Sequence, residues 1–175
     1  MLVSDLKKTI REIPDFPKPG VGFKDITTLF VNPIAFKSAM DRMVERYQGE
    51  KIDLVAGIDA RGFSVAAVLA YRLGLGMILV RKGGKLPGQV EAEDYALEYG
   101  EATIEVHKDS VEAGQRILIV DDLLATGGTA AAAGRIFERL GARIEAFGFL
   151  VELDFLKGRE KLPPDRVFSL IHFED

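Results

Sequence analysis

The sequence predicts an α/β protein with a mostly parallel central sheet flanked by helices. Several candidate strands are apolar throughout rather than alternating with polar residues, which is typical of strands buried on both faces. They also alternate along the chain with helical segments, as expected of parallel strands joined by helical crossovers. The 175 residues fit one domain, 1–175, with a single substantial core.

The first third of the chain predicts two helices separated by an extended segment. Apolar residues recur at helical spacing near the N-terminus, behind a candidate cap at Ser4 or Asp5. Three prolines within residues 14–19 exclude a helix there. Asn32 and Pro33 then form a typical helix start. The residues of the first apolar face are Val3, Leu6, Ile10 and Ile13.

In the rest of the chain, expected strands alternate with expected helices, except at residues 82–100. Residues 82–100 are glycine-rich, charged and without periodicity, so we expect a long functional loop there. Alternating residues at 95–99 and 102–106 indicate a hairpin around Gly100 that closes the loop. The expected strands are 52–58, 77–80, 117–120, 144–151 and 167–171, and the expected helices are 62–73 and a segment ending at 140.

Composition excludes several classes of protein. The chain is 47% hydrophobic and 29% charged with a net charge of -4, so it lacks the basic excess of a nucleic-acid binder. No apolar run approaches the roughly 18 residues of a membrane span, and the N-terminus does not resemble a targeting segment. The absence of cysteine excludes disulfides, thiolate catalysis and cysteine-ligated zinc. It suits a reducing compartment, and we expect a cytoplasmic protein without membrane or nucleic-acid partners.

The strongest motif is I-L-I-V-D-D-L-L-A-T-G-G-T-A at 117–130, where a buried strand leads into a loop of small residues and then a helix. Gly127 and Gly128 let the backbone approach an anion closely. Thr126 and Thr129 add hydroxyl groups, and the helix start adds unpaired N–H groups. The motif therefore predicts a phosphate cradle. A short G-G-T alone would more often be a tight turn capped by Asp122.

Two carboxylates stand at the end of that strand. Asp121 and Asp122 lie at the carboxyl end, where open α/β sheets bind ligands. Adjacent residues on a strand point to opposite sides, so the two acids need not do the same job. Beside a phosphate they suit a sugar phosphate, whose hydroxyls can donate to them. Mg²⁺ is the expected cofactor because it prefers oxygen ligands and bridges phosphates.

Two further segments offer positive charge. A-G-I-D-A-R-G-F at 56–63 is a strand, polar turn and helix start, where Arg61 could grip an oxyanion or form an ordinary surface ion pair. V-R-K-G-G-K-L-P-G at 80–88 gathers three basic side chains in an acidic protein. A solvated basic turn is the alternative reading of the second segment. Its basic residues are Arg81, Lys82 and Lys85.

The complete arrangement at 117–130 resembles the phosphoribosyl pyrophosphate (PRPP) signature of type I phosphoribosyltransferases. The resemblance implies that the acidic pair, Asp121 and Asp122, holds the ribose hydroxyls and contributes to catalysis. It also implies that the turn Asp59, Ala60 and Arg61 holds pyrophosphate, with Arg61 contributing to catalysis. The basic residues Arg81, Lys82 and Lys85 are implied to bind PRPP near a homodimer interface, where some of them could serve the neighbouring subunit's site. The residues implied to hold the 5-phosphate are Ala125, Thr126, Gly127, Gly128 and Thr129.

Other segments are similar to the adenine-specific branch of that family. They are I-P-D-F-P-K-P-G-V-G-F-K-D-I-T at 13–27, K-L-P-G, Y-A-L-E-Y-G, V-E-L and L-K-G-R-E-K-L, and they span nearly the whole chain. The similarity implies an N-terminal hood within 1–32 and a mobile loop at 82–100. It implies that Glu98 is the catalytic acid/base and that Tyr99 lies near the phosphate. The residues implied to border adenine are Val21, Phe23, Lys24 and Leu153.

Each of these roles has an ordinary structural alternative. Val21, Phe23 and Leu153 could be core residues, Lys24 a surface cation, and Glu98 an exposed strand carboxylate. His107 and His172 match no ligand pattern and are interpreted as structural.

The chain departs from the family pattern in its hood and its loop. Thr28 stands where proline is common, and Gly22 replaces a larger apolar residue. Three acids in the loop, Glu91, Glu93 and Asp94, stand where fewer charges are usual.

The resemblance implies an enzyme of purine salvage. It would transfer ribose 5-phosphate from PRPP to adenine and release AMP and pyrophosphate, with Mg²⁺ held mainly by PRPP oxygens and water rather than by assigned side chains. Two other readings remain. One is a non-catalytic PRPP sensor that binds nucleic acid, which should add a DNA-binding domain or a basic face. The other is a transferase for hypoxanthine, guanine or xanthine.

Overall fold

A seven-stranded sheet forms the centre of the molecule. The computed structural model describes residues 1–97 and 100–174. The strand order is β5-β6-β4-β3-β7-β8-β9, with β4, β3, β7, β8 and β9 parallel and the β5–β6 hairpin antiparallel at one edge. The strands are β3 (Leu54–Ile58), β4 (Gly76–Lys82), β5 (Val90–Ala96), β6 (Glu101–His107), β7 (Arg116–Leu124), β8 (Arg143–Leu153) and β9 (Val167–Phe173). The predicted α/β class is confirmed.

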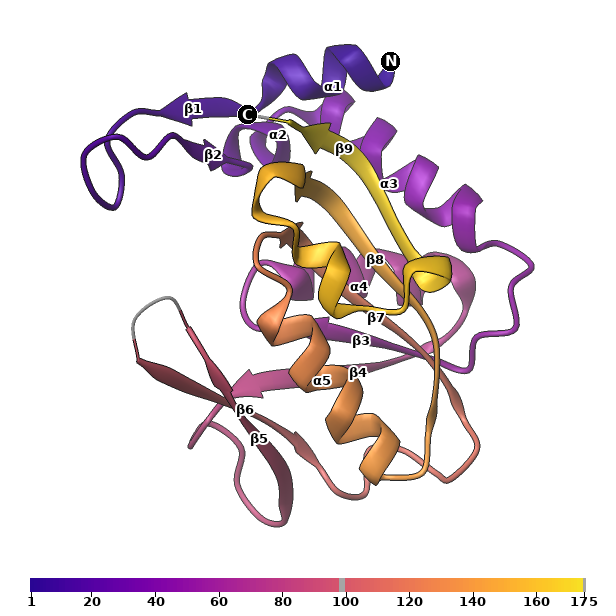
Figure 1. Cartoon of the computed structure of the whole chain (residues 1–175). Helices are drawn as coiled ribbons and strands as arrows, with labels where there is room; N and C mark the ends of the chain where they lie inside the picture. Colours follow the sequence, from indigo (N-terminus) through magenta and orange to yellow (C-terminus); the bar gives the residue numbers. More distant parts are fainter. Residues whose placement is uncertain (98–99, 175) are drawn as a thin grey trace.

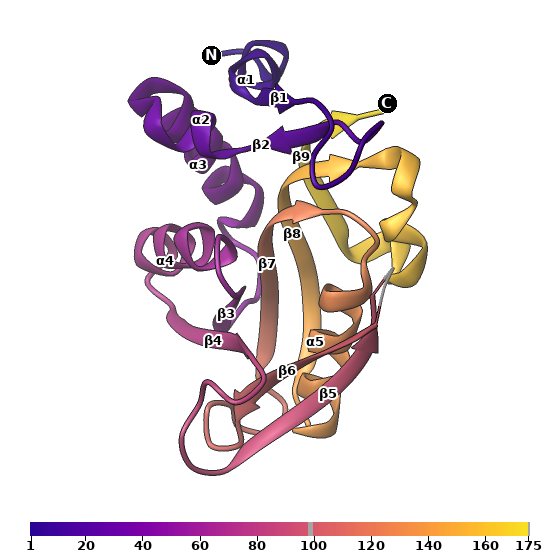
Figure 2. The same ribbon diagram turned by 90° about the vertical axis from the view of Figure 1, so that its left-hand side faces the viewer.

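Helices cover both faces of the sheet (Figure 2). On one face lie α3 (Pro33–Tyr47) and α4 (Gly62–Leu73), and on the other α5 (Gly128–Arg139). Each face has its own cluster of buried apolar side chains, and β7 contributes to both. Leu118 and Val120 belong to one cluster, and Ile117 and Ile119 belong to the other. The continuously apolar strand therefore reflects burial on both faces.

A small hood, with a two-stranded sheet of its own, packs against the main sheet through Leu6, Ile10, Ile26 and Leu29. It comprises α1 (Val3–Thr9), the antiparallel pair β1 (Arg11–Ile13) and β2 (Phe23–Asp25), and α2 (Thr27–Val31). The hood strands and the β5–β6 hairpin project on the left of Figure 1, on the side toward which β4 points. Three short 3₁₀ turns, η1 (Asp154–Leu156), η2 (Gly158–Lys161) and η3 (Pro164–Arg166), join β8 to β9.

Local sequence explains where two of the helices begin or end. Asn32 caps α3, since its side-chain oxygen accepts hydrogen bonds from the N–H groups of Ile34 and Ala35, each 3.1 Å long. Pro33 fits the first turn, where its missing N–H has no helical partner in any case. Gly74 ends α4 in the left-handed conformation.

The structure corrects the expected bounds of the N-terminal helix, with its cap, and of the loop at 82–100. The N-terminal helix stops at Thr9, and Ile13 lies in β1, because residues 11–13 pair with 23–25. Neither Ser4 nor Asp5 caps that helix, whose N-cap is Leu2. The segment 82–100 is not one long loop, because β5 begins at Val90 rather than at Tyr95. Long-range pairing, which short-range periodicity does not report, decides both cases.

Candidate active site

The predicted acidic pair lies at the carboxyl end of β7 beside Arg61. Asp122 is 4% exposed, and the Nε of Arg61 donates to its Oδ2 at 2.5 Å. The backbone N–H of Asp122 donates to Oδ1 of Asp121 at 2.8 Å. Desolvation and the neighbouring charge of Asp122 raise the pKa of Asp121 well above its usual range. The two carboxyl groups face one arginine and one backbone N–H, so a ligand that brings hydroxyl groups or a cation would give them further partners.

The phosphate loop is held from behind by a second segment. Gly127 is the N-cap of α5 with φ +76°, so glycine meets the conformational requirement there. A Cβ on Gly127 would collide with the backbone of Gly158, and a Cβ on Gly158 would collide with the carbonyl of Ala125. Two glycines thus allow the loop and η2 to lie backbone against backbone. Thr126 and Thr129 occupy the same loop and the first turn of α5.

The predicted pyrophosphate turn lies next to the acidic pair. Arg61 is the N-cap residue of α4, and a Cβ on Gly62 would lie 2.8 Å from Oδ1 of Asp121. The Asp59–Ala60 peptide bond is cis. The Nε of Arg81 donates to Oδ2 of Asp59 at 2.9 Å, and the backbone N–H of Lys82 donates to the same oxygen at 3.4 Å, so two of the three basic residues are joined directly to this turn.

Glu105, which sequence reasoning missed, shapes the basic turn. It is 5% exposed on β6 and accepts hydrogen bonds from the N–H groups of Gly84, Lys85 and Leu86 at 2.7–3.0 Å. Backbone hydrogen bonds from Leu86 and Gly84 lower the pKa of its carboxyl. The turn that carries Lys85 is therefore held by a fixed acceptor.

The predicted base-binding residues line a single cavity of about 640 Å³. Arg61 and Ala125 line the same cavity, so the hood, the pyrophosphate turn and the phosphate loop meet there. The lining residues that sequence reasoning did not assign include Glu12, Lys18, Leu123, Phe155 and Leu156. The four predicted residues are Val21, Phe23, Lys24 and Leu153.

Lys24 is not a surface cation. Its side chain is 9% exposed, its ammonium donates to Oε2 of Glu12 at 2.5 Å, and it lies 4.8 Å from the centroid of the Phe173 ring. Gly22 makes room for this ion pair, because a Cβ there would lie 2.6 Å from Oε1 of Glu12.

Thr28, the other departure in the hood, has partners of its own. Its hydroxyl donates to the carbonyl of Thr9 at 2.6 Å and accepts from the N–H of Arg11 at 3.1 Å. The threonine therefore joins the end of α1 to the start of β1. Both unusual hood residues fit their surroundings.

The predicted catalytic Glu98 and its neighbour Tyr99 lie outside the described residues. The strand that leads to them is described, and it reaches the phosphate loop. A Cβ on Gly128 would lie 3.4 Å from the ring of Tyr95 and 3.6 Å from the carbonyl of Ala96.

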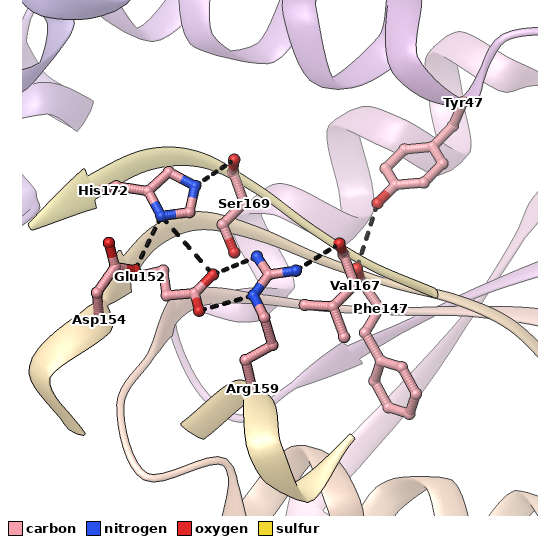
Figure 3. A network of polar contacts seen from close by, with 8 residues as sticks. All are labelled: Tyr47, Phe147, Glu152, Asp154, Arg159, Val167, Ser169 and His172. Atoms are coloured by element: carbon pink, nitrogen blue, oxygen red, sulfur yellow. Dashed lines mark hydrogen bonds and ion pairs between the residues drawn. The ribbon is translucent and has the colours of Figure 1, made fainter. Parts of the chain in front are cut away.

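An ion pair with a buried carboxylate, between Glu152 and Arg159, was also missed (Figure 3). Glu152 is 3% exposed and accepts two hydrogen bonds from Arg159, at 2.6 and 3.0 Å. Arg159 also donates to the carbonyl of Val167. Glu152 immediately precedes Leu153, and Arg159 follows Gly158, so the pair fixes a cavity wall and the support of the phosphate loop. The V-E-L and L-K-G-R-E-K-L motifs contained this signal, but the sequence does not show that their charges meet.

His172 lies beside that pair. Its Nδ1 is 2.9 Å from Oδ1 of Asp154, and its Nε2 is 3.2 Å from the carbonyl oxygen of Ser169. Glu152, Asp154 and His172 are close enough together to share a metal ion. The guanidinium of Arg159 already engages both oxygens of Glu152, which opposes a cation there, and these contacts support the structural interpretation of His172.

Comparison with known proteins agrees with this geometry. The family model of the phosphoribosyl transferase domain matches residues 25–173. The adenine phosphoribosyltransferase of Syntrophotalea carbinolica is 53% identical over 171 residues, covering 98% of this chain and 100% of the relative.

Solved structures are also similar to this chain. The crystal structure of adenine phosphoribosyltransferase from Thermoanaerobacter pseudethanolicus has a TM-score of 0.94 and 49% identity, covering 98% of this chain and 100% of its own. The Saccharomyces cerevisiae enzyme, complexed with adenine and an imino-altritol bisphosphate, has a TM-score of 0.90 and 42% identity, with 97% and 98% covered.

Proposed function

The chain belongs to the phosphoribosyltransferase family, within its adenine phosphoribosyltransferases, and we propose that it transfers ribose 5-phosphate from PRPP to adenine, releasing pyrophosphate and AMP, in purine salvage. The observation that carries the proposal is the cavity shared by the hood, Arg61 and Ala125. It joins an apolar compartment suited to a flat base with a loop suited to a phosphate.

The acidic pair and the arginines suit the charges of this reaction. The C1–O bond to pyrophosphate breaks while a bond forms from C1 to a ring nitrogen of adenine, and positive charge develops on the ribose. Arg61 and Arg81 would neutralise the leaving pyrophosphate. Asp121 and Asp122 would accept hydrogen bonds from the ribose hydroxyls. Arg61 contacts Asp122 in the present structure, so donor binding would move its guanidinium to the pyrophosphate and free that carboxylate.

The hood would select the base. Val21, Phe23 and Leu153 offer apolar surfaces, but such surfaces barely distinguish one purine from another. Backbone groups of residues 21–24 would provide discrimination, with a carbonyl accepting from the exocyclic amine of adenine and an N–H donating to a ring nitrogen. Glu98 is the proposed group for the proton that the base loses.

Mg²⁺ fits the oxygen-rich chemistry of the site. Asp122 is already bonded to Arg61, so we propose that the ion is held mainly by PRPP oxygens and water, with Asp121 and Asp122 bonded to the sugar. The ion would supply positive charge to the leaving pyrophosphate.

Location and assembly are also proposals. We propose a cytoplasmic homodimer, as the family resemblance implies, and analytical ultracentrifugation would test the assembly. The part of the chain that the structure describes contains no helix long and apolar enough to span a membrane.

A base panel tests the activity. Purified protein with PRPP and Mg²⁺ should convert adenine to AMP, measured by chromatography, and should use hypoxanthine and guanine at least 10³-fold less efficiently. An Asp122→Asn variant provides the inactive control. Use of hypoxanthine or guanine within about tenfold of adenine would contradict adenine specificity.

A further inference from the structure

The β5–β6 hairpin is joined to the main sheet by a short ladder. In the described part of the chain, β6 pairs with β4 through Arg81 with Glu105 and Lys82 with Ile104, and the N–H of Gly83 adds a hydrogen bond to the carbonyl of Thr103 at 2.8 Å. β5 and β6, in contrast, pair along seven positions. Among residues 1–97 and 100–174, β5 is the edge strand, so its outer side has no neighbouring strand to fix it. Contacts outside the sheet must therefore contribute to the orientation of β5.

Part of that contact is apolar, because Ile104 and Val106 of β6 are buried in one cluster with residues of α5. The polar contacts of β5 come from two arginines of α5. The Nε of Arg135 donates to Glu93 at 2.6 Å. Arg139 donates to Glu91 at 2.7 Å, to Glu93 at 2.5 Å and to the carbonyl of Ala92 at 2.8 Å. Hydrogen bonds from Arg135 and Arg139 lower the pKa of Glu93. We call these four charged side chains the α5 latch, and Figure 2 shows β5 passing along α5.

The spacing of the latch matches a strand to a helix. Glu91 and Glu93 are two residues apart on one face of β5, about 6.6 Å along the strand. Arg135 and Arg139 are four residues apart on one face of α5, about 6 Å along the helix. The third acid of the segment, Asp94, accepts instead from the hydroxyl of Thr103 within the hairpin. Two of the three acids that depart from the family pattern therefore have a specific partner surface.

The latch acts on the candidate site through α5 itself. That helix begins at Gly128 in the phosphate loop, where Tyr95 and Ala96 approach it. Holding β5 along α5 keeps the end of β5 over the phosphate loop. It also holds the start of the segment that continues to Glu98.

We propose that Arg135 and Arg139 are positioning residues whose ion pairs with Glu91 and Glu93 hold the β5–β6 hairpin closed over the phosphate loop. The expected effect of this positioning on turnover rests on the proposed function, whereas the closure of the hairpin does not. The latch side chains are 19–48% exposed, so salt should weaken their pairs. Breaking all of them should shift the hairpin about tenfold toward the open state.

Hydrogen exchange of the unliganded protein tests closure without using activity. Exchange of β5 amides is compared among the parent, Arg135→Gln/Arg139→Gln, Glu91→Gln/Glu93→Gln and the variant with all four changes. Asp94→Asn is the matched control, because it removes an acid from the same strand without touching α5. We expect about tenfold faster exchange in β5 for both double variants, no further increase in the fourfold variant, and little change for Asp94→Asn. In 0.5 M NaCl the parent should approach the double variants.

Turnover is then measured on the same proteins with adenine, PRPP and Mg²⁺. A positioning role predicts that the double variants lose about tenfold in kcat/KM, while the free energy of unfolding falls only slightly. Unchanged β5 exchange, additive effects of the two double substitutions, or equal acceleration in the core strand β7 would overturn the latch. Faster β5 exchange with unchanged kcat/KM would overturn its positioning role. Absence of AMP formation by the parent would refute the proposed function while leaving the exchange result standing.

Discussion

Substitution of Gly127 by alanine tests the contact between the phosphate loop and η2. At φ +76° an alanine costs about 1–2 kcal/mol in the left-handed region. Its Cβ would also meet the carbonyl and Cα of Gly158, and relieving such overpacking typically costs about 1–3 kcal/mol. The expected total loss is about 2–5 kcal/mol in the free energy of unfolding, part of which appears as displacement of the loop.

Gly74 provides a matched control for the backbone cost. It has φ +69° at the end of α4, and a Cβ there would meet nothing within 4 Å. Gly74→Ala should therefore lose about 1–2 kcal/mol and keep the parent KM for PRPP. Urea unfolding gives the stability difference between the two variants, and steady-state kinetics gives both KM values.

The Gly127→Ala substitution should change the KM values for PRPP and adenine to different extents. The KM for PRPP should rise at least tenfold and the KM for adenine much less, because the displaced loop faces the phosphate. Equal stability losses for Gly127→Ala and Gly74→Ala, together with an unchanged KM for PRPP, would refute the reasoning.

Substitutions at four further positions test the rest of the site and the hood. Asp122→Asn should lose most turnover and keep its fold by circular dichroism, because a ribose contact gains strength in the charged transition state; near-normal kcat would exclude that role. Arg61→Ala should weaken PRPP binding more than adenine binding in calorimetry, and equal weakening would count against the assignment. Lys24→Ala should keep base preference, whereas Lys24→Pro should damage it by removing an N–H. The reverse result would favour side-chain recognition. The pKa of Asp25 is lowered to about 2 by hydrogen bonds from Thr27 and Arg11, so its contribution is present above about pH 4 and lost as pH falls toward 2. Asp25→Asn should cost about 1–2 kcal/mol at neutral pH in urea unfolding, and should flatten the stability profile between pH 4 and 2; a parallel profile would contradict this.

Sequence reasoning succeeded where one segment contains the whole signal. The strand from Ile117 ends in two acids and a glycine turn, so its burial, its loop and its helix could all be predicted from consecutive residues. The same holds for the helix that Asn32 caps, since cap and first turn are adjacent in the chain. The base-binding set needed the family resemblance, because Leu153 is far in sequence from the hood whose cavity it shares.

Sequence reasoning failed where the structure depends on distant pairing. Ile13 continues an apolar helical pattern, yet it pairs with Phe23 in the hood. The role of the acids of β5 could not be predicted, because their partners are two arginines of α5 that lie more than 40 residues further along the chain. Glu105 resembles any alternating strand acid, and only the fold brings three turn N–H groups to it. In each case the sequence shows the type of side chain but not the residue with which it pairs.

The exposed fraction of the side chains in each ion pair indicates which part of the site moves. Glu152 is 3% exposed, and its side chain and that of Arg159 are 4% and 34% exposed, so removing Arg159 would leave a buried carboxylate without its partner, which typically costs about 3–5 kcal/mol. Glu93 and Glu91 keep 19% and 24% side-chain exposure, and partly solvated pairs of this kind contribute about 0.2–1 kcal/mol each. Thermal motion and salt can break pairs of the second kind, whereas pairs of the first kind persist. The wall beside Leu153 should therefore stay in place while the β5–β6 hairpin opens to admit substrates.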